Sequence, residues 1–461
     1  MIDSSVEPTS GSFYYSANPH DEEELCIRIL KILVELINSQ RMPTVIDGEL
    51  TVDCDDETDN RRRLTPRSHL LIHYFSTVEQ SSLQKDEAKT PKERLLHIQN
   101  FLNRLGATEL FIHLIRFTSS DRVFEQTLKL ATTILDGGNN DIQTQLLKLL
   151  KQDQKDSEKF FSVIRERMDQ AQQDLKNGSS VSTDDLLAFK RGATTSNSQL
   201  SGIAQISNLV ADEMHDAATI SARAIEAVQV GAGDQLSRQH GMPDEEEKVD
   251  NRLSSSVQLM EPLMRFLQLL CENHNLELQK YLRDQGNKTN YDLVSETLRF
   301  LDCICGSTTG VLGLLGLYIN KNNVELIKQA LETLTEYCQG PCVPNQYAIA
   351  LHESNGLDIV TAIVVDEMES LKGQGLDEDV HELKLSACKL LLAIIESHRQ
   401  DSEIYNRIYR SVQGPRQLLK AMVASYETRH LKSNEIETVG HSLYILLHQL
   451  SKNNPEIKER F

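Results

Sequence analysis

The stretch FLQLLCENHN … NYDLVSETLRFLDCICGSTTGVLGLLGLYIN … LTEYCQGPC, which runs from Phe266 to Cys342, decides the fold of this 461-residue chain. Its apolar residues recur at the three- and four-residue spacing of amphipathic helices. The stripe that ends at Leu270 and the segments Tyr291–Ile304 and Val324–Tyr337 show this spacing. The stretch therefore predicts several short helices joined by turns.

The same pattern continues on both sides of this stretch. Before it, apolar stripes predict helices over Glu22–Asn38, Glu109–Phe117, Asp121–Leu135, Asp141–Leu150 and Ser157–Leu175. After it, they predict helices over Leu357–Leu371, Glu382–Ser397, Pro415–Tyr426 and Val439–Leu450. Amphipathic helices of this length with short connections are typical of stacked helical repeats. We therefore predict an all-α, armadillo/HEAT-like helical solenoid, although no fixed-period sequence repeat is visible.

Composition divides this predicted solenoid into two helical blocks. Residues 1–21 are rich in Ser, Pro and acids and are predicted to be disordered. The first block spans 22–175 and contains a variable loop over 41–89. Residues 176–253 are polar and acidic and predict a mostly disordered linker before the second block, 254–461. Within the first block, Thr90-Pro91-Lys92-Glu93 predicts a capping box at the start of a helix that stops at Gly106.

Charge and motif content exclude several classes of function. The formal net charge of −20 argues against nucleic-acid binding, which needs a basic surface. No apolar run reaches the length of a transmembrane helix, so no membrane span is expected in this chain. The sequence also lacks the phosphate-loop, zinc-protease, serine-hydrolase and kinase motifs. We therefore expect the protein not to be an enzyme.

Eight cysteines are spread along the chain, and two pairs of them invite a metal interpretation. A zinc site could combine the following residues: Cys303, Cys305, Cys338, Cys342, His274 and His352. The spacings C-x-C and C-x-x-x-C are not those of the usual zinc knuckles, however, and the residues lie in apolar helical patterns. Buried free thiols are the favoured interpretation.

Several words of the sequence resemble those of inositol 1,4,5-trisphosphate receptors. FLQLLCENHN and LTEYCQGPC are similar to both these receptors and the ryanodine receptors, whereas FLDCICGSTTG and LGLLGLYIN look like the former alone. SSDRVF (Ser119–Phe124), the turn Gly137–Asn139, KFF (Lys159–Phe161) and VGHSLYILLHQL look like it too. Their order matches the late cytosolic modulatory region, so 254–461 is identified as the helical domain that both channel families share.

The resemblance also implies a calcium site. In both channel families one glutamate of the LLCE-x-HN word and one of the LTEY word bind cytosolic calcium, which implies Glu272 and Glu336 as partial ligands here. The remaining oxygen in these families is a backbone carbonyl from a domain beyond the pore. Two carboxylates are too few for tight binding, so we expect weak binding by this chain alone. The alternative is that each glutamate is an ordinary acid on a helix surface.

The expected function follows from the resemblance. The chain is expected to be a fragment, a partial gene model or a truncated isoform that couples ligand and calcium sensing to the pore of a calcium-release channel. Its partners would be the remaining domains and the other subunits of a homotetramer, at the cytosolic face of the endoplasmic reticulum membrane. A free-standing helical scaffold and a ryanodine-receptor fragment remain as alternatives.

Overall fold

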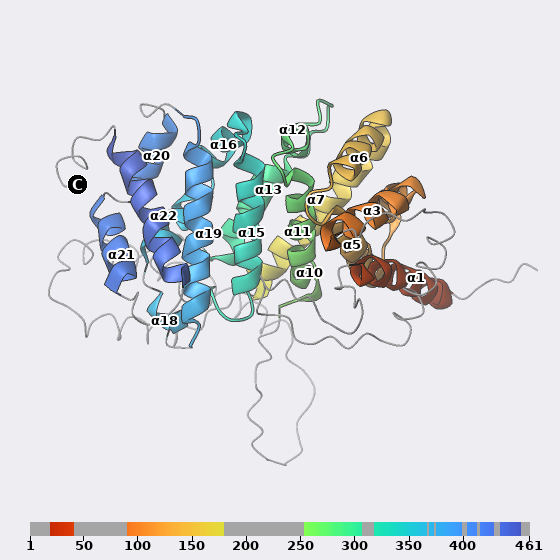
Figure 1. Cartoon of the computed structure of the whole chain (residues 1–461), viewed down its shortest axis with the longest axis horizontal. Helices are drawn as coiled ribbons and strands as arrows, with labels where there is room; N and C mark the ends of the chain where they lie inside the picture. Colours follow the sequence, from red (N-terminus) through yellow and green to blue (C-terminus); the bar gives the residue numbers. More distant parts are fainter. Residues whose placement is uncertain are drawn as a thin grey trace, which may run out of the picture. The chain divides into compact units, whose positions relative to one another are not determined.

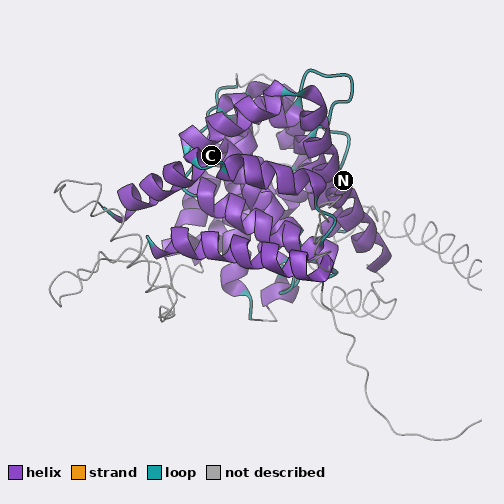
Figure 2. Cartoon of the chain, turned by 90° about the vertical axis from the view of Figure 1, so that its right-hand side faces the viewer, coloured by secondary structure: helices purple, strands orange, loops and turns teal. Residues whose placement is uncertain are grey.

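The structure is a computed structural model that describes residues 19–40, 90–178, 253–306, 318–366, 368–372, 375–398, 403–412, 415–427 and 434–452. All regular secondary structure in these ranges is helical, which confirms the predicted all-α class (Figure 2). The predicted disorder of 1–21, the variable loop 41–89 and the linker 176–253 fall outside these ranges, apart from a few residues at their edges. Those predictions stay predictions.

The described helices form five consecutive groups of three, which α1 (Pro19–Ser39) precedes. Two single-turn helices, α10 (Ser255–Gln258) and α18 (Glu369–Lys372), lie in connections within these groups. The three helices of each group are, in order, α3 (Pro91–Arg104), α4 (Ala107–Phe117) and α5 (Asp121–Leu135); α6 (Asn140–Gln152), α7 (Gln154–Gly178) and α11 (Met260–Cys271); α12 (Leu276–Arg283), α13 (Leu293–Ile304) and α15 (Val324–Cys338); α16 (Val343–Ala350), α17 (Gly356–Val365) and α19 (Asp377–Ile395); and α20 (Glu403–Ser411), α21 (Pro415–Glu427) and α22 (Asn434–Ser451).

Equivalent helices of successive groups pack against one another. The third helices α5, α11, α15, α19 and α22 contact each other in that order, and Figure 1 shows α11, α15 and α19 side by side. The second helices α4, α7, α13, α17 and α21 form another such row. Each group is therefore one three-helix repeat of an armadillo-like stack, in which a repeat buries its apolar faces against its neighbours.

The two predicted helical blocks share one of these repeats. In the second repeat, α7 and α11 are separated in sequence by 179–252, so the predicted boundary falls between two helices that belong together. The ring of Phe266 on α11 is fully buried and lies edge-on to Phe111 of α4 and Phe160 of α7, with ring centroids 6.0 and 6.5 Å apart. The end of α7 also contacts α10, where the hydroxyls of Ser254 and Ser256 donate to the Asp174 carboxylate.

A buried glutamine on the first helix holds the end of the third helix in four of these repeats. Its Nε2 group donates to two carbonyls, that of the C-cap residue and that of the residue three positions earlier. We call this arrangement the glutamine clamp. The four clamps are Gln99 to Thr133 and Asp136, Gln143 to Leu269 and Glu272, Gln279 to Glu336 and Gln339, and Gln346 to Ala393 and Glu396, with N···O distances of 2.6–3.2 Å.

The clamps recur because the connection between repeats follows one pattern. DGGNNDIQ (Asp136–Gln143), ENHNLELQ (Glu272–Gln279) and QGPCVPNQ (Gln339–Gln346) each run from a C-cap residue to the next clamp glutamine. The fourth residue of each word is the N-cap of the following helix. In the first two stretches this residue is an asparagine that donates from Nδ2 to the Oε1 atom of the preceding clamp glutamine. Asn139 donates to Gln99 at 3.1 Å, and Asn275 donates to Gln143 at 2.9 Å. The sequence thus contains a repeated eight-residue motif, but its copies begin at unequal intervals along the chain.

The third word has cysteine where the others have asparagine, and this has a testable consequence. Cys342 supplies no side-chain cap to α16, and the buried Oε1 of Gln279 has no hydrogen-bond partner. Cys342→Asn should supply both bonds and raise the free energy of unfolding by about 1 kcal/mol. Chemical denaturation measures the change, and Cys388→Asn, inside α19, is the control that should destabilise the chain. A lower stability for Cys342→Asn than for the wild type would contradict the prediction.

The structure confirms the predicted capping box, but it also contains short helices that the sequence did not predict. The capping box is confirmed, because Thr90 accepts from Glu93 N and Thr90 N donates to the Glu93 carboxylate, and α3 stops before Gly106 at φ 91°. The short helices α12, α16 and α20 were not predicted. The helix predicted over Leu357–Leu371 is confirmed as far as Val365, where α17 ends; its continuation to Leu371 is wrong, because the chain turns at Met368 (φ 47°) before α18. No helix of the described residues is both long and apolar enough to cross a bilayer.

Candidate functional site

The two predicted calcium ligands lie at the ends of neighbouring third helices. Glu272 is the C-cap residue of α11, and Glu336 lies in the last turn of α15. The glutamine clamps hold the C-terminal ends of α11 and α15 in the same way, so both carboxylates belong to the same edge of the stack. The fold therefore brings near each other two side chains that lie more than sixty residues apart in the sequence.

Both glutamates of this pair have raised pKa values. Burial and, to a smaller extent, the negative charge of Glu272 together raise the pKa of Glu336 to about 7, although the Arg265 guanidinium acts in the opposite direction. Burial likewise raises the pKa of Glu272, with Arg265 lowering it and Asp136 raising it. One oxygen of each glutamate, Oε2, is buried and makes no hydrogen bond. Buried carboxylate oxygens without donors are costly unless a proton or a cation joins them.

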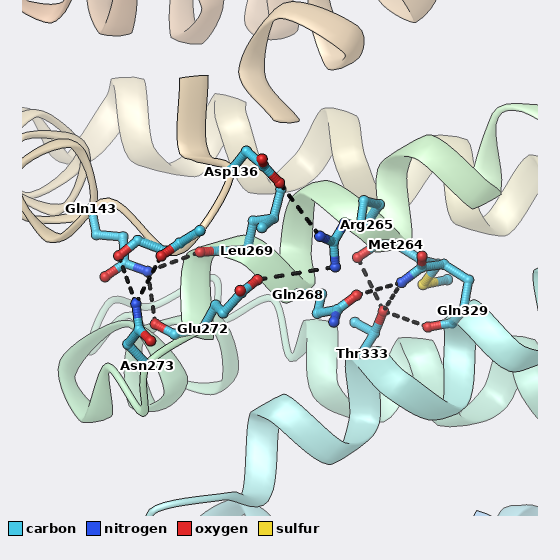
Figure 3. Close-up of polar contacts among 12 residues, drawn as sticks. Asp136, Gln143, Met264, Arg265, Gln268, Leu269, Glu272, Asn273, Gln329 and Thr333 are labelled. Atoms are coloured by element: carbon cyan, nitrogen blue, oxygen red, sulfur yellow. Dashed lines mark hydrogen bonds and ion pairs between the residues drawn. The ribbon is translucent and has the colours of Figure 1, made fainter. Parts of the chain in front are cut away.

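Arg265 forms ion pairs with two carboxylates of this cluster. Its Nη2 lies 3.8 Å from Asp136 Oδ1, and its Nη1 lies 4.0 Å from Glu272 Oε2 (Figure 3). One guanidinium faces three carboxylates, counting Glu336, and neither distance is that of a hydrogen bond. When Glu272 and Glu336 are both ionised, their two negative charges exceed the single charge of this guanidinium, which favours an additional cation.

The loop after Glu272 is fixed to the loop of the preceding repeat. Asn273, at φ 64°, donates from Nδ2 to the carbonyls of Gly137 and Gly138 at 3.0 and 2.9 Å. Gly138 has φ 66°, and a Cβ there would lie 2.3 Å from Asn273 Nδ2, so the close approach requires glycine. The position of Glu272 thus depends on residues of the first repeat.

A second acidic group among the described residues already has a cation. The carboxylates of Glu325, Asp379 and Glu382 lie within 4.8 Å of one another. Lys328 Nζ lies 2.6, 3.1 and 2.5 Å from them and is 9% exposed. This group joins α15 to α19 as an ion-pair network, and its lysine fills the place that a metal ion would take.

The cysteine and histidine residues do not gather into a zinc site in the part of the chain that the structure describes. No group of three His, Cys or acidic side chains other than the one around Lys328 is close enough there to share an ion. Cys303, Cys305, Cys338 and Cys342 are all buried. Burial raises the pKa of each thiol, which keeps it protonated and a poor metal ligand.

Comparison with known proteins gives two findings. Residues 254–364 match the family model described as "RyR and IP3R Homology associated", and both glutamates fall inside that range. The chain is also 33% identical over 440 residues to the inositol 1,4,5-trisphosphate receptor itr-1 of Caenorhabditis elegans. The aligned region covers 92% of this chain, and it spans 15% of the length of that receptor.

Proposed function

We propose that this chain is a cytosolic regulatory segment of a calcium-release channel. The premise is its similarity to an inositol 1,4,5-trisphosphate receptor and the match of residues 254–364 to the domain named for these receptors and the ryanodine receptors. Its role is to couple ligand occupancy and calcium sensing to the pore. The observation that carries the proposal is the pair Glu272 and Glu336: the Oε2 atom of each is buried without a hydrogen bond, and the charge of Glu272 raises the pKa of Glu336. We propose no catalytic role.

Calcium suits this pair chemically. It binds six to eight oxygens and prefers carboxylates and carbonyls. Two glutamates supply too few of these, so water and a partner domain must complete the shell. An ion that needs both surfaces binds best when they are in contact, and it therefore stabilises the arrangement in which they meet. Weak binding by this chain alone is the expected cost of such a shared site.

The partners follow from the same premise. We propose that the segment acts beside the remaining domains and the other subunits of a homotetrameric channel, at the cytosolic face of the endoplasmic reticulum membrane. The net charge of −20 supports protein and cation partners over nucleic acid.

A chimeric receptor tests the proposal. The matching region of the C. elegans receptor is replaced by this chain and expressed in cells that lack inositol trisphosphate receptors. We expect inositol trisphosphate to release stored calcium from these cells, whereas a receptor with the region deleted should release none. A chimera that assembles and binds inositol trisphosphate but never opens would refute the proposed role and favour the free-standing scaffold.

The raised pKa of Glu336 predicts how calcium activation depends on pH. Because that pKa is about 7, the carboxyl is increasingly protonated as pH falls below this value, and calcium must displace the proton. The calcium concentration for half-maximal activation of the chimera should therefore rise by up to about tenfold per unit below pH 7. Above about pH 8 it should level off. Single-channel recording measures the profile; a profile that is flat through neutral pH argues against Glu336 as a ligand.

A further inference from the structure

We propose that Gln143 and Gln279 are positioning residues that hold the two carboxylate-bearing helix ends at a fixed separation. The calcium part of this inference rests on the proposed function, whereas the positioning itself does not. The two clamps differ from the other two in one respect, because each donates directly to the backbone of a glutamate of the site.

Gln143 fixes the end of α11. Its side chain is 1% exposed, and Nε2 donates to the carbonyls of Leu269 and Glu272 at 2.9 and 3.0 Å (Figure 3). The last carbonyls of a helix have no partner within the helix, so an outside donor is needed where they are buried. Glu272 is the C-cap residue itself, and its carboxylate therefore moves with the peptide that Gln143 binds.

Gln279 fixes the end of α15 in the same way. The side chain is fully buried, and Nε2 donates to the carbonyls of Glu336 and Gln339 at 2.6 and 2.8 Å. Its Oε1 has no hydrogen-bond partner, so the nitrogen makes every hydrogen bond of this amide. Removing that nitrogen would leave two buried carbonyls unpaired, and the last turn of α15, which carries Glu336, would be the part to fray.

Asn275 connects the two clamps. Its Nδ2 donates to Gln143 Oε1 at 2.9 Å, and its Oδ1 accepts from Leu278 N as the N-cap of α12, the helix that carries Gln279. A continuous path of hydrogen bonds and one helical turn therefore runs from α6 through Asn275 and Gln279 to Glu336. A movement of the second repeat against the third would change the separation of the two carboxylates.

Three matched substitutions test the inference. Gln143→Met and Gln279→Met keep the side-chain length and remove the donor. Gln346→Met makes the same change in a clamp that holds no carboxylate of the cluster. Asn275→Ser is a milder variant, since serine can cap α12 but is too short to reach Gln143. All are made in the full chain, and folding is checked by melting temperature.

The first readout is the titration of Glu336, which does not depend on calcium. With the chain labelled at the glutamate carboxyl carbons, NMR follows the resonance that disappears in Glu336→Gln. The midpoint should lie near 7 in the wild type. It should shift by about half a unit or more in the Gln143, Gln279 and Asn275 variants, a large change against the usual spread of carboxyl pKa values. It should stay in place in the Gln346 variant.

The second readout is calcium activation in the chimeric receptor. Substituting residues that orient metal ligands usually costs about tenfold or more in affinity, and we expect that loss for the Gln143 and Gln279 variants alone. Equal shifts of the Glu336 midpoint in the Gln143, Gln279 and Gln346 variants, or no shift in folded Gln143 and Gln279 variants, would overturn the inference. A midpoint that shifts as expected, in a receptor where Glu336→Gln leaves calcium activation unchanged, supports positioning and refutes the calcium role.

Discussion

Replacing Glu336 by glutamine should raise the calcium concentration that activates a channel carrying this segment by about tenfold or more, while inositol trisphosphate binding stays unchanged. The substitution keeps the size of the side chain and removes one of the two carboxylates that we assign to calcium. In a site with few protein ligands, the loss of one full charge cannot be made up by the others. Single-channel recording across calcium concentrations measures the shift.

The control for this prediction lies one turn earlier on the same helix. Glu332 is exposed on α15 and adds a minor part of the negative field at Glu336. Glu332→Gln removes the same charge nearby without removing a ligand, so it should shift activation by much less. Glu272→Gln should behave like Glu336→Gln. If Glu336→Gln and Glu332→Gln shift activation equally, the effect is one of general charge and the assignment to calcium fails.

Phe266→Ala should produce the largest loss of stability among the substitutions considered. The ring is fully buried where α11 meets α4 and α7, and large-to-small changes at such positions cost about 3–5 kcal/mol. Because the first and second predicted blocks meet at this ring, both should lose stability together. Hydrogen exchange, read by mass spectrometry, should show amides of α5 and of α15 opening more easily in the variant.

Phe117→Ala is the matched control for the same residue type. Phe117 is 57% exposed at the end of α4, so its removal leaves no buried cavity and should cost about 0.5 kcal/mol or less. If amides of the Phe266→Ala chain exchange faster only in α11 and in the repeats that follow it, the two blocks are independent units. That outcome would contradict the shared repeat described above.

The sequence predicted most of the long helices and the two candidate ligands. Long amphipathic helices leave a strong apolar period, and the Thr90–Glu93 capping box is a local signal that depends on four residues. Glu272 and Glu336 were found through the words around them. Periodicity does not reveal that the charge of Glu272 acts on Glu336, because that depends on how two repeats stack.

The clamps and the short helices that carry them were missed for a physical reason. Apolar periodicity treats glutamine as a surface residue, yet Gln279 and Gln346 are fully buried because their amides pair with helix-end carbonyls. The helices α12 and α16 have only eight residues each, too few for a periodic stripe. The signal that would have found them is the eight-residue word from a C-cap residue to a glutamine, aligned without regard to spacing.

Arg265 was also missed, and again the cause is geometric. On sequence grounds it is one basic residue of an amphipathic helix. Only the packing of α11 against α5 brings it between Asp136 and Glu272. Its partner Asp136 belongs to the preceding repeat, so the sequence around Arg265 gives no sign of that ion pair.

The contact between the end of α7 and the start of α10 bears on how this protein can vary. Asp174 and Ser254 hold the two ends of the intervening stretch together. The entropy of closing a chain between fixed ends grows only with the logarithm of its length, about 0.6 kcal/mol for each doubling. A change in the number of residues between these two ends should therefore cost little stability and leave the register of the repeats unchanged.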